Sequence, residues 1–141
     1  MNGRALGVDP GEARIGLALS DALGMTAQPL ETLECVGPKK DLNRIVERAR
    51  EHEVSTIVIG LPLLMSGEEG SAAAASREMA EGLRRRVQGI EIVLWDERLT
   101  TVVAERTMID ADVRRGKRKK KVDALAAVLI LQGWLDAQSF V

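Results

Sequence analysis

Two short apolar segments on either side of a Pro-Gly turn open the chain, and they set the first constraint on the fold. The segment Leu6-Gly7-Val8-Asp9 ends at Pro10-Gly11, and a second apolar segment follows at residues 15–19. Proline and glycine between two runs of strand-forming residues mark a turn. The first 20 residues therefore predict two neighbouring antiparallel strands.

The remainder of the chain alternates between helical and strand patterns. A third strand is predicted over residues 26–33, at an edge of the sheet, because Pro29 has no N–H to give to a second neighbour. The elements predicted after it are a helix over residues 41–52, a strand over 56–59, a helix over 71–87, a strand over 91–95, a helix capped by Thr100 or Thr101, and a last helix over 122–138. In the helix over 71–87, Ala75, Met79 and Leu83 are expected to form the buried stripe.

This order of elements predicts an α/β fold. Three antiparallel strands followed by alternating helices and strands give a mixed five-stranded sheet, in which the last two strands are parallel and helices cover both faces. This is the element order of an RNase H-like domain. A chain of 141 residues has room for one such domain, spanning residues 1–141. Unrelated activities share this architecture, so the site must decide the function.

The charged residues are distributed unevenly, although the net charge is only −1. Seven of the 20 basic residues stand within eight positions: Arg114, Arg115, Lys117, Arg118, Lys119, Lys120 and Lys121. The rest of the chain has 13 basic and 21 acidic residues, a net charge of about −8. The basic run is either a solvated loop or a loop that contacts phosphate groups.

Acidic residues follow two of the predicted strands directly. Asp9 stands at the end of the first strand, and Asp96 and Glu97 follow the strand that ends at Trp95. Ligands of α/β sheets bind outside the carboxyl ends of the strands, so these acids are expected to face one crevice. A carboxylate on a central strand is costly to bury unless it is paired or binds a metal ion.

A further acid, Asp123, stands at the start of the last predicted helix. Ala126 and Ala127 follow it, and their small side chains would let the helix lie close to the sheet and bring Asp123 toward Asp9. An acid in a first helical turn also interacts favourably with the helix dipole, so a purely structural role for Asp123 stays open.

Three converging carboxylates repel one another and require cations. Oxygen ligands suit Mg²⁺ or Mn²⁺, and the chain has too few His and Cys residues for a zinc site. The single histidine, His52, is expected at the surface or at a helix end. Two divalent ions about 4 Å apart can activate water and stabilise the leaving oxygen of a phosphodiester without a histidine base. This chemistry fits hydrolysis of a nucleic acid.

Four motifs in order carry a family resemblance: GVDPGEARIGLA at residues 7–18, IGLPL at 59–63, DERLTT at 96–101 and KVDALAA at 121–127. Together they resemble the YqgF family, also called RuvX or Holliday-junction-resolvase-like, whose members look like pre-16S rRNA nucleases. The resemblance covers nearly the whole chain. It implies that Asp9, Glu97 and Asp123 are catalytic acids that bind Mg²⁺ or Mn²⁺, and that the reaction matures the 5′ end of precursor 16S rRNA.

One position separates this chain from the related resolvases. Their middle acid comes from the fourth strand, at the position that corresponds here to Gly60. Glu97 must then reach across from the neighbouring strand, and Gly60 has no side chain to obstruct it. Asp96 is the less favoured member of the acidic pair.

Three other functions remain open. A Holliday-junction resolvase acting in DNA repair needs two active sites and therefore a dimer, so the chain is expected to be a monomer or a homodimer. A non-catalytic RNA-binding or ribosome-assembly factor would use the basic run alone. Sugar-kinase and actin-like ATPases bind nucleotide between two such domains, and one domain argues against them.

The expected partner is nucleic acid, RNA before DNA. The basic run leads directly into Asp123, which favours contact with phosphate groups. Arg14 and Arg98 each stand close to an acid and are candidates for phosphate contact or for a salt bridge. The three aromatic residues and the absence of tyrosine supply little for stacking bases.

A cytoplasmic location is expected. The single cysteine, Cys35, cannot form an internal disulfide, and the N-terminus begins in a strand pattern rather than a leader. The apolar run at residues 122–131 is too short to span a bilayer of ~30 Å, so no membrane anchor is expected.

Overall fold

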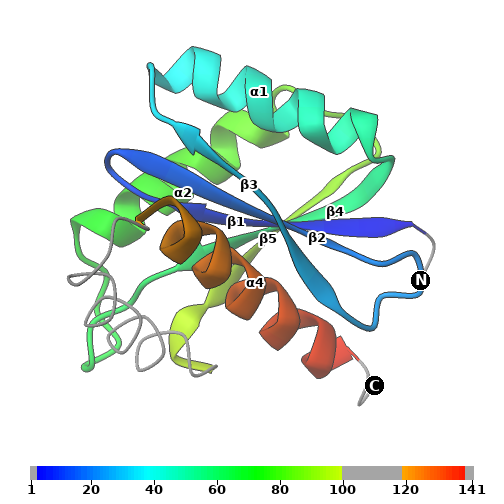
Figure 1. Cartoon of the computed structure of the whole chain (residues 1–141). Coiled ribbons are helices and arrows are strands. Elements are labelled where there is room, and N and C mark those ends of the chain that lie inside the picture. Colours follow the sequence, from blue (N-terminus) through cyan, green and yellow to red (C-terminus); the bar gives the residue numbers. More distant parts are fainter. Residues whose placement is uncertain (1–2, 100–118, 139–141) are drawn as a thin grey trace.

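The computed structural model describes residues 3–99 and 119–138, and within the last helix it describes side chains from residue 124 onward. One five-stranded sheet has the strand order β3-β2-β1-β4-β5 (Figure 1). The strands are β1 (Arg4–Pro10), β2 (Arg14–Ser20), β3 (Ala27–Glu34), β4 (Val54–Leu61) and β5 (Glu91–Asp96). The helices are α1 (Pro38–Glu51), α2 (Ser71–Arg84) and α4 (Lys119–Gln138), and a 3₁₀ turn, η1 (Glu97–Leu99), follows β5.

The sheet is mixed, as the element order predicts. β1 pairs with β2 and β2 with β3 in antiparallel fashion, whereas β4 is parallel to β1 and β5 is parallel to β4. Pro29 lies in β3, whose one partner in the described sheet is β2. The edge position predicted from this proline is confirmed. The helix predicted after Thr100 or Thr101 lies outside the described residues.

Helix α1 begins three residues earlier than predicted, because Pro38 is part of its first turn. A proline is accepted there since the first helical N–H groups have no partner within the helix. The carboxylate of Asp41 reaches back and accepts hydrogen bonds from the N–H groups of Val36 and Gly37, 3.0 and 3.4 Å long. His52 forms the C-cap, as expected of a helix-end residue.

Helix α2 buries a different stripe from the predicted one. Its buried residues are Ala73, Ser76, Ala80, Gly82 and Leu83. Of the three predicted residues, Leu83 is buried, Met79 is half-buried and Ala75 is exposed. Four consecutive alanines at 72–75 make the start of the helix apolar on every side, so the hydrophobic period there cannot distinguish the inner face.

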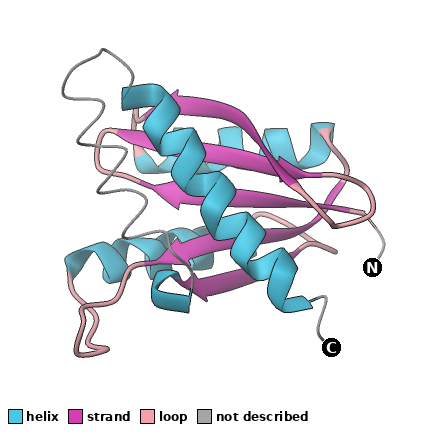
Figure 2. Ribbon diagram, turned by 60° about the horizontal axis from the view of Figure 1, so that its bottom comes forward, coloured by secondary structure: helices cyan, strands magenta, loops and turns pink. Residues whose placement is uncertain are grey.

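The two faces of the sheet bury side chains of different size. The face under α1 and α2 carries large aliphatic residues such as Leu6, Val8 and Ile57. The face under α4 carries small ones, including Ala5 and Ala18. Figure 2 shows α4 crossing that face obliquely while the other helices lie behind the sheet. Small residues under α4 let this helix approach the strands closely.

The contact at Gly7 shows how closely α4 approaches β1. A β-carbon on Gly7 would lie 2.7 Å from Cβ of Leu131 and 2.9 Å from the carbonyl oxygen of Ala127. These distances are shorter than a real methyl group tolerates, so the helix and the strand are in direct backbone contact here. The close packing expected from Ala126 and Ala127 is confirmed.

Helix α4 runs antiparallel to β1. Near its C-terminal end, Gln132 accepts a hydrogen bond of 2.9 Å from the N–H of Ala27, a residue paired with the last residue of β2. Its N-terminal end therefore lies toward the end of β1 that carries Asp9 (Figure 1). The helix begins at Lys119, so the last three residues of the basic run are helical, and their assignment to a loop is wrong.

Candidate active site

Asp9 lies near the carboxyl end of β1, in the centre of the sheet, and is 6% exposed. Alternate residues of a strand point to the same face, and Ala5 and Gly7 both meet α4. Asp9 therefore belongs to the α4 face. In the neighbouring strand β2, Asp9 pairs with Gly16, which has no side chain to stand beside the carboxylate.

Glu97 is the first residue of η1 and is 2% exposed. Its side chain turns back over β4, because a β-carbon on Gly60 would lie 3.0 Å from Glu97 Oε2. The same β-carbon would lie 2.5 Å from Cδ1 of Ile130 in α4, which places Gly60 on the α4 face as well. The reach of Glu97 across the neighbouring strand, predicted from the glycine at position 60, is confirmed.

The register of β1 and β4 relates the two acids. Val8 pairs with Ile59, so Asp9 and Gly60 are the next residues along two parallel strands. Neighbouring strands lie about 4.8 Å apart. The carboxylate of Glu97 above Gly60 and that of Asp9 thus occupy the same face at the same end of the sheet. The two described acids therefore lie at the carboxyl ends of the strands, as expected from their positions in the sequence.

The third predicted acid, Asp123, lies in the first turns of α4, one helical turn before Ala127. The side chain of Asp123 is outside the described part of the structure. Among the described side chains, no three His, Cys, Asp or Glu residues gather into a group that could hold a metal ion. The complete triad of Asp9, Glu97 and Asp123 therefore stays a prediction.

Asp96 does not share the position of Glu97. Its carboxylate forms an ion pair with Arg98, with 2.8 Å between Oδ2 and Nη2. The hydrogen bond from the Arg98 side chain lowers the pKa of Asp96 against the opposing effect of burial, and the Arg98 backbone N–H adds to the lowering. Arg98, two residues further along the chain, thus favours the ionised form of Asp96.

Of the residues predicted to contact phosphate, the structure describes the side chains of only Arg14 and Arg98. Arg14 forms an ion pair with Glu34, 3.4 Å from Nε to Oε1, and Arg98 pairs with Asp96. Arg98 therefore makes the salt bridge to its nearby acid that the sequence left open as an alternative, whereas the ion pair that the structure describes for Arg14 is with Glu34 on β3 and not with an acid close to it in the sequence. Arg114, Arg115, Lys117 and Arg118 lie outside the described residues. Lys119, Lys120 and Lys121 form the start of α4, and their side chains are not described.

One contact near the site is not predicted by the sequence. Arg98 Nη1 lies 3.4 Å from the position that a β-carbon on Gly67 would occupy. Ser66-Gly67 signals a turn, and Gly67 has the positive φ of +89° that favours glycine. The Ser66-Gly67 pair therefore predicts the turn, but it does not predict that Arg98 lies beside it.

The donor set fits a hard divalent cation. The two described acids supply only oxygen ligands, they are buried, and Gly60 leaves the space that the carboxylate of Glu97 fills. Oxygen donors of this kind suit Mg²⁺ and Mn²⁺. Asp9 and Glu97 are therefore the residues that could hold such an ion.

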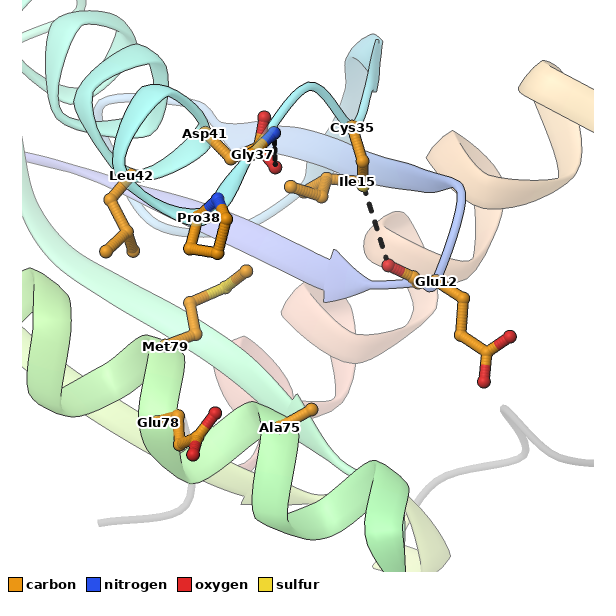
Figure 3. Close-up of a pocket in the computed structure, with 11 residues that line it drawn as sticks. Glu12, Ile15, Cys35, Gly37, Pro38, Asp41, Leu42, Ala75, Glu78 and Met79 are labelled. Atoms are coloured by element: carbon orange, nitrogen blue, oxygen red, sulfur yellow. Dashed lines mark hydrogen bonds between the residues drawn. The ribbon is translucent and has the colours of Figure 1, made fainter.

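A cavity of about 420 Å³ lies between the β1–β2 turn and helices α1 and α2, on the face of the sheet away from α4 (Figure 3). Met79 and Leu42 face it from the two helices, and the Cys35 thiol at its wall donates a 3.7 Å hydrogen bond to the carbonyl of Gly11. None of the predicted catalytic acids lines this cavity. The predicted catalytic acids and this cavity are thus on opposite faces of the sheet.

The fold and the paired acids define an RNase H-like α/β domain, and solved structures agree. RuvC from Thermus thermophilus in complex with a Holliday junction superposes with a TM-score of 0.61 at 16% identity, covering 98% of this chain and 96% of that one. The yeast mitochondrial Holliday junction resolvase gives a TM-score of 0.56 at 12% identity, covering 98% of this chain and 81% of that one.

The chain belongs to the RuvX family, described as Holliday junction resolvase, whose model matches residues 3–137. Relatives named "Putative pre-16S rRNA nuclease" are similar over almost their whole length. The relative from Halalkalibacterium halodurans is 53% identical, with 96% of this chain and 97% of the relative covered. The relative from Myxococcus xanthus is 49% identical, with 95% and 88% covered. The family resemblance carried by the four motifs is confirmed. No helix in the described part is long and apolar enough to cross a membrane.

Proposed function

We propose that the protein is a divalent-metal-dependent nuclease that acts in the cytoplasm on the 5′ end of precursor 16S rRNA. The observation that carries the proposal is the pair of buried carboxylates, Asp9 and Glu97, on one face at the carboxyl ends of β1 and β5. Relatives about half identical to this chain are named for the same substrate.

The acids are proposed to hold Mg²⁺ or Mn²⁺, with Asp123 completing the set. When bound, the metal would activate water and stabilise the leaving oxygen of the phosphodiester. Asp9 and Glu97 supply the negative charge that retains the cation, and the packing of α4 excludes bulk water from behind them. The start of α4, which carries the end of the basic run, approaches the same end of the sheet.

Nucleic acid is the proposed partner. The basic residues 114–121 would neutralise backbone phosphates, a contact that is independent of base sequence. Arg14 and Arg98 would join them only by sharing or leaving their carboxylate partners. These contacts serve to hold the substrate strand across the acids.

A Holliday-junction resolvase is the second candidate, favoured by the family description and by the resolvase fold. It would require two active sites and so a homodimer. An RNA-binding assembly factor without catalysis is the third candidate.

One experiment distinguishes these three functions. Purified wild type and Asp9→Asn are incubated with RNA spanning the 5′ end of precursor 16S rRNA, with a scrambled RNA and with a four-way DNA junction, in Mg²⁺, Mn²⁺ or EDTA. The proposal expects cleavage of the precursor by the wild type, lost in EDTA and in the variant. Symmetric cleavage of the junction by a dimer in gel filtration would instead favour the resolvase. Binding without metal-dependent cleavage would favour the assembly factor.

A further inference from the structure

The turn after β5 is stabilised by the side chain of Asp96, the residue that precedes Glu97. Oδ1 of Asp96 accepts a hydrogen bond of 2.9 Å from the backbone N–H of Arg98. An aspartate that accepts from the N–H two residues on stabilises a local turn. Glu97 is the residue enclosed by that turn. Its backbone direction is therefore set by Asp96.

The Arg98 guanidinium engages the same carboxylate from the other side. Nε lies 3.1 Å from Oδ1 and 3.2 Å from Oδ2 of Asp96, and Nη2 lies 2.8 Å from Oδ2. With the backbone contact, each carboxylate oxygen accepts twice. An ionised carboxylate offers about four lone-pair sites. Three N–H groups of Arg98 thus occupy most of the acceptor sites of Asp96 within its own turn, with Nε–H shared between the two oxygens.

The guanidinium also contacts the loop after β4. Gly67 lies against Arg98, with 3.4 Å between Nη1 and the position of a β-carbon on the glycine. The loop is itself ordered, because the N–H of Leu64 donates to Glu68 and the N–H of Gly67 donates to Leu64, at 2.9 and 2.8 Å. The Arg98 guanidinium therefore lies beside Gly67, in the loop that follows the adjacent strand β4.

We propose that Asp96 and Arg98 form a clamp that positions Glu97 over Gly60, and that Asp96 is a positioning residue and not a ligand of the metal ion. The proposal rests on the nuclease function proposed above. It follows from the interactions of the three consecutive residues. Asp96 and Arg98 form an ion pair and hydrogen bonds with each other, and the side chain of Glu97, between them, lies over Gly60 of β4.

Three variants separate the clamp from its alternatives. Asp96→Asn keeps an oxygen that can accept from the Arg98 N–H but loses the ion pair. Asp96→Ala loses both interactions. Arg98→Ala loses the ion pair and keeps the backbone turn. The clamp expects kcat to fall roughly tenfold in Asp96→Asn and in Arg98→Ala, with KM unchanged, and to fall further in Asp96→Ala.

The double variant Asp96→Asn/Arg98→Ala tests whether the two residues act together. The clamp expects its kcat to match the single variants, because both remove the same ion pair. If Asp96 binds the metal, Asp96→Asn and Asp96→Ala abolish cleavage equally, as expected for Asp9→Asn. If Arg98 binds phosphate independently of Asp96, Arg98→Ala raises KM and Asp96→Asn leaves KM unchanged. The effects of the two substitutions on kcat/KM then multiply in the double variant. Either result overturns the proposal.

The matched control is Glu81→Gln, which breaks an exposed Glu–Arg pair on α2 and is expected to leave cleavage at the wild-type rate. Loss of activity in this control would mean that removing any surface ion pair impairs the protein, and the clamp would be rejected.

Two measurements do not depend on nuclease activity. Hydrogen exchange of the Arg98 amide is expected to be slow in wild type and Asp96→Asn and fast in Asp96→Ala. Binding of Mn²⁺ alone, followed by electron paramagnetic resonance, is expected to survive in Asp96→Asn and to be lost in Glu97→Gln. If the wild type cleaves no substrate, the proposed function fails while these two measurements still decide the clamp. An unprotected Arg98 amide in the wild type, or loss of Mn²⁺ binding in Asp96→Asn, would refute it.

Discussion

The carboxylate of Glu97 lies over Gly60, with Oε2 3.0 Å from the position that a β-carbon on Gly60 would occupy. Gly60 lies in β4, and Glu97 is the first residue after the adjacent parallel strand β5, in which Trp95 pairs with Gly60. An acid after β5 can therefore serve a site above β4 only if position 60 carries no side chain.

Replacement of Gly60 by alanine is expected to abolish most of the activity. The added methyl group would lie 3.0 Å from Glu97 Oε2 and 2.5 Å from Cδ1 of Ile130, so the carboxylate and the isoleucine must both move. A displacement of about 1 Å at a catalytic group can cost roughly a hundredfold in rate. Overpacking should also lower the free energy of unfolding by about 1–3 kcal/mol. Cleavage assays and urea unfolding measure the two effects.

Gly70→Ala provides the matched control for this substitution. Gly70 precedes α2 with φ −99°, and a β-carbon there meets nothing within 4 Å. Cleavage at the wild-type rate is expected. An equally active Gly60→Ala would show that Glu97 does not act from its position above β4.

Asp9→Asn should remove cleavage and leave nucleic-acid binding intact, because it removes a ligand charge while hardly changing shape. Glu97→Gln should be nearly as severe and Asp96→Asn milder. Cleavage rates measured beside filter binding test this order. Activity of Asp9→Asn within a factor of a few of wild type would contradict the metal-site assignment, and a reversed order would mean that Asp96 is the ligand.

Most of the sheet can be predicted from the sequence because its signals are local. The Pro-Gly turn, the edge proline and the short apolar strands each mark one element, and all five strands are found within two residues of the predicted boundaries. The reach of Glu97 is implied by the resemblance to the resolvases, whose middle acid stands at the position of Gly60, and the glycine shows in the sequence that no side chain obstructs it.

The structural features that could not be predicted from the sequence depend on which other elements each helix or loop packs against. In α2 the alanines at 72–75 hide the buried face, which only the sheet and α1 define. In the basic run, charge alone predicts a loop, whereas the helix that follows extends back to Lys119 because α4 is anchored along its length by the sheet. The approach of Arg98 to Gly67 brings together two residues 31 positions apart in the sequence.

Gly7→Ala tests the packing of α4. The methyl group would meet backbone and Cβ atoms of α4, 2.9 Å from the carbonyl oxygen of Ala127 and 2.7 Å from Cβ of Leu131, and neither can rotate away. The helix must shift, so the free energy of unfolding should fall by about 1–3 kcal/mol or more. Urea unfolding of Gly7→Ala beside Gly70→Ala measures it. Equal stability of the two variants would show that α4 is not fixed against β1.

Asp41→Asn tests the start of α1 and has a defined pH dependence. Burial opposes ionisation of Asp41, but hydrogen bonds from Val36, Arg44 and Gly37 outweigh it and lower the pKa from its ordinary value of 3.8. The charged form thus stabilises the fold above pH 3.8, and this contribution is lost as the pH falls through the lowered folded value. At neutral pH the variant should be less stable by about 1 kcal/mol. Urea unfolding should show this difference closing in acid; a constant difference would contradict it.

The last prediction concerns the basic run. Replacing Lys117, Arg118, Lys119 and Lys120 with alanine should weaken binding to all nucleic-acid sequences alike. If all four contact phosphate, the slope of log affinity against log salt should fall by roughly 3 to 4, at about 0.7–0.9 per contact. Folding should be retained, because two of these residues occupy the first turn of α4, where positive charge opposes the helix dipole and alanine favours the helix.

Lys39→Ala/Lys40→Ala is the control, because these exposed lysines lie in the first turn of α1, on the side of the sheet away from α4. Their removal lowers the positive charge of the protein without touching the end of the sheet that carries Asp9, so the salt slope should stay at the wild-type value. Fluorescence anisotropy of a labelled RNA at several salt concentrations measures all three proteins. A folded quadruple variant with an unchanged slope would mean that the run is a solvated segment. Substrate capture would then have to be assigned to Arg14 and Arg98, whose ion pairs with Glu34 and Asp96 would need to open on binding.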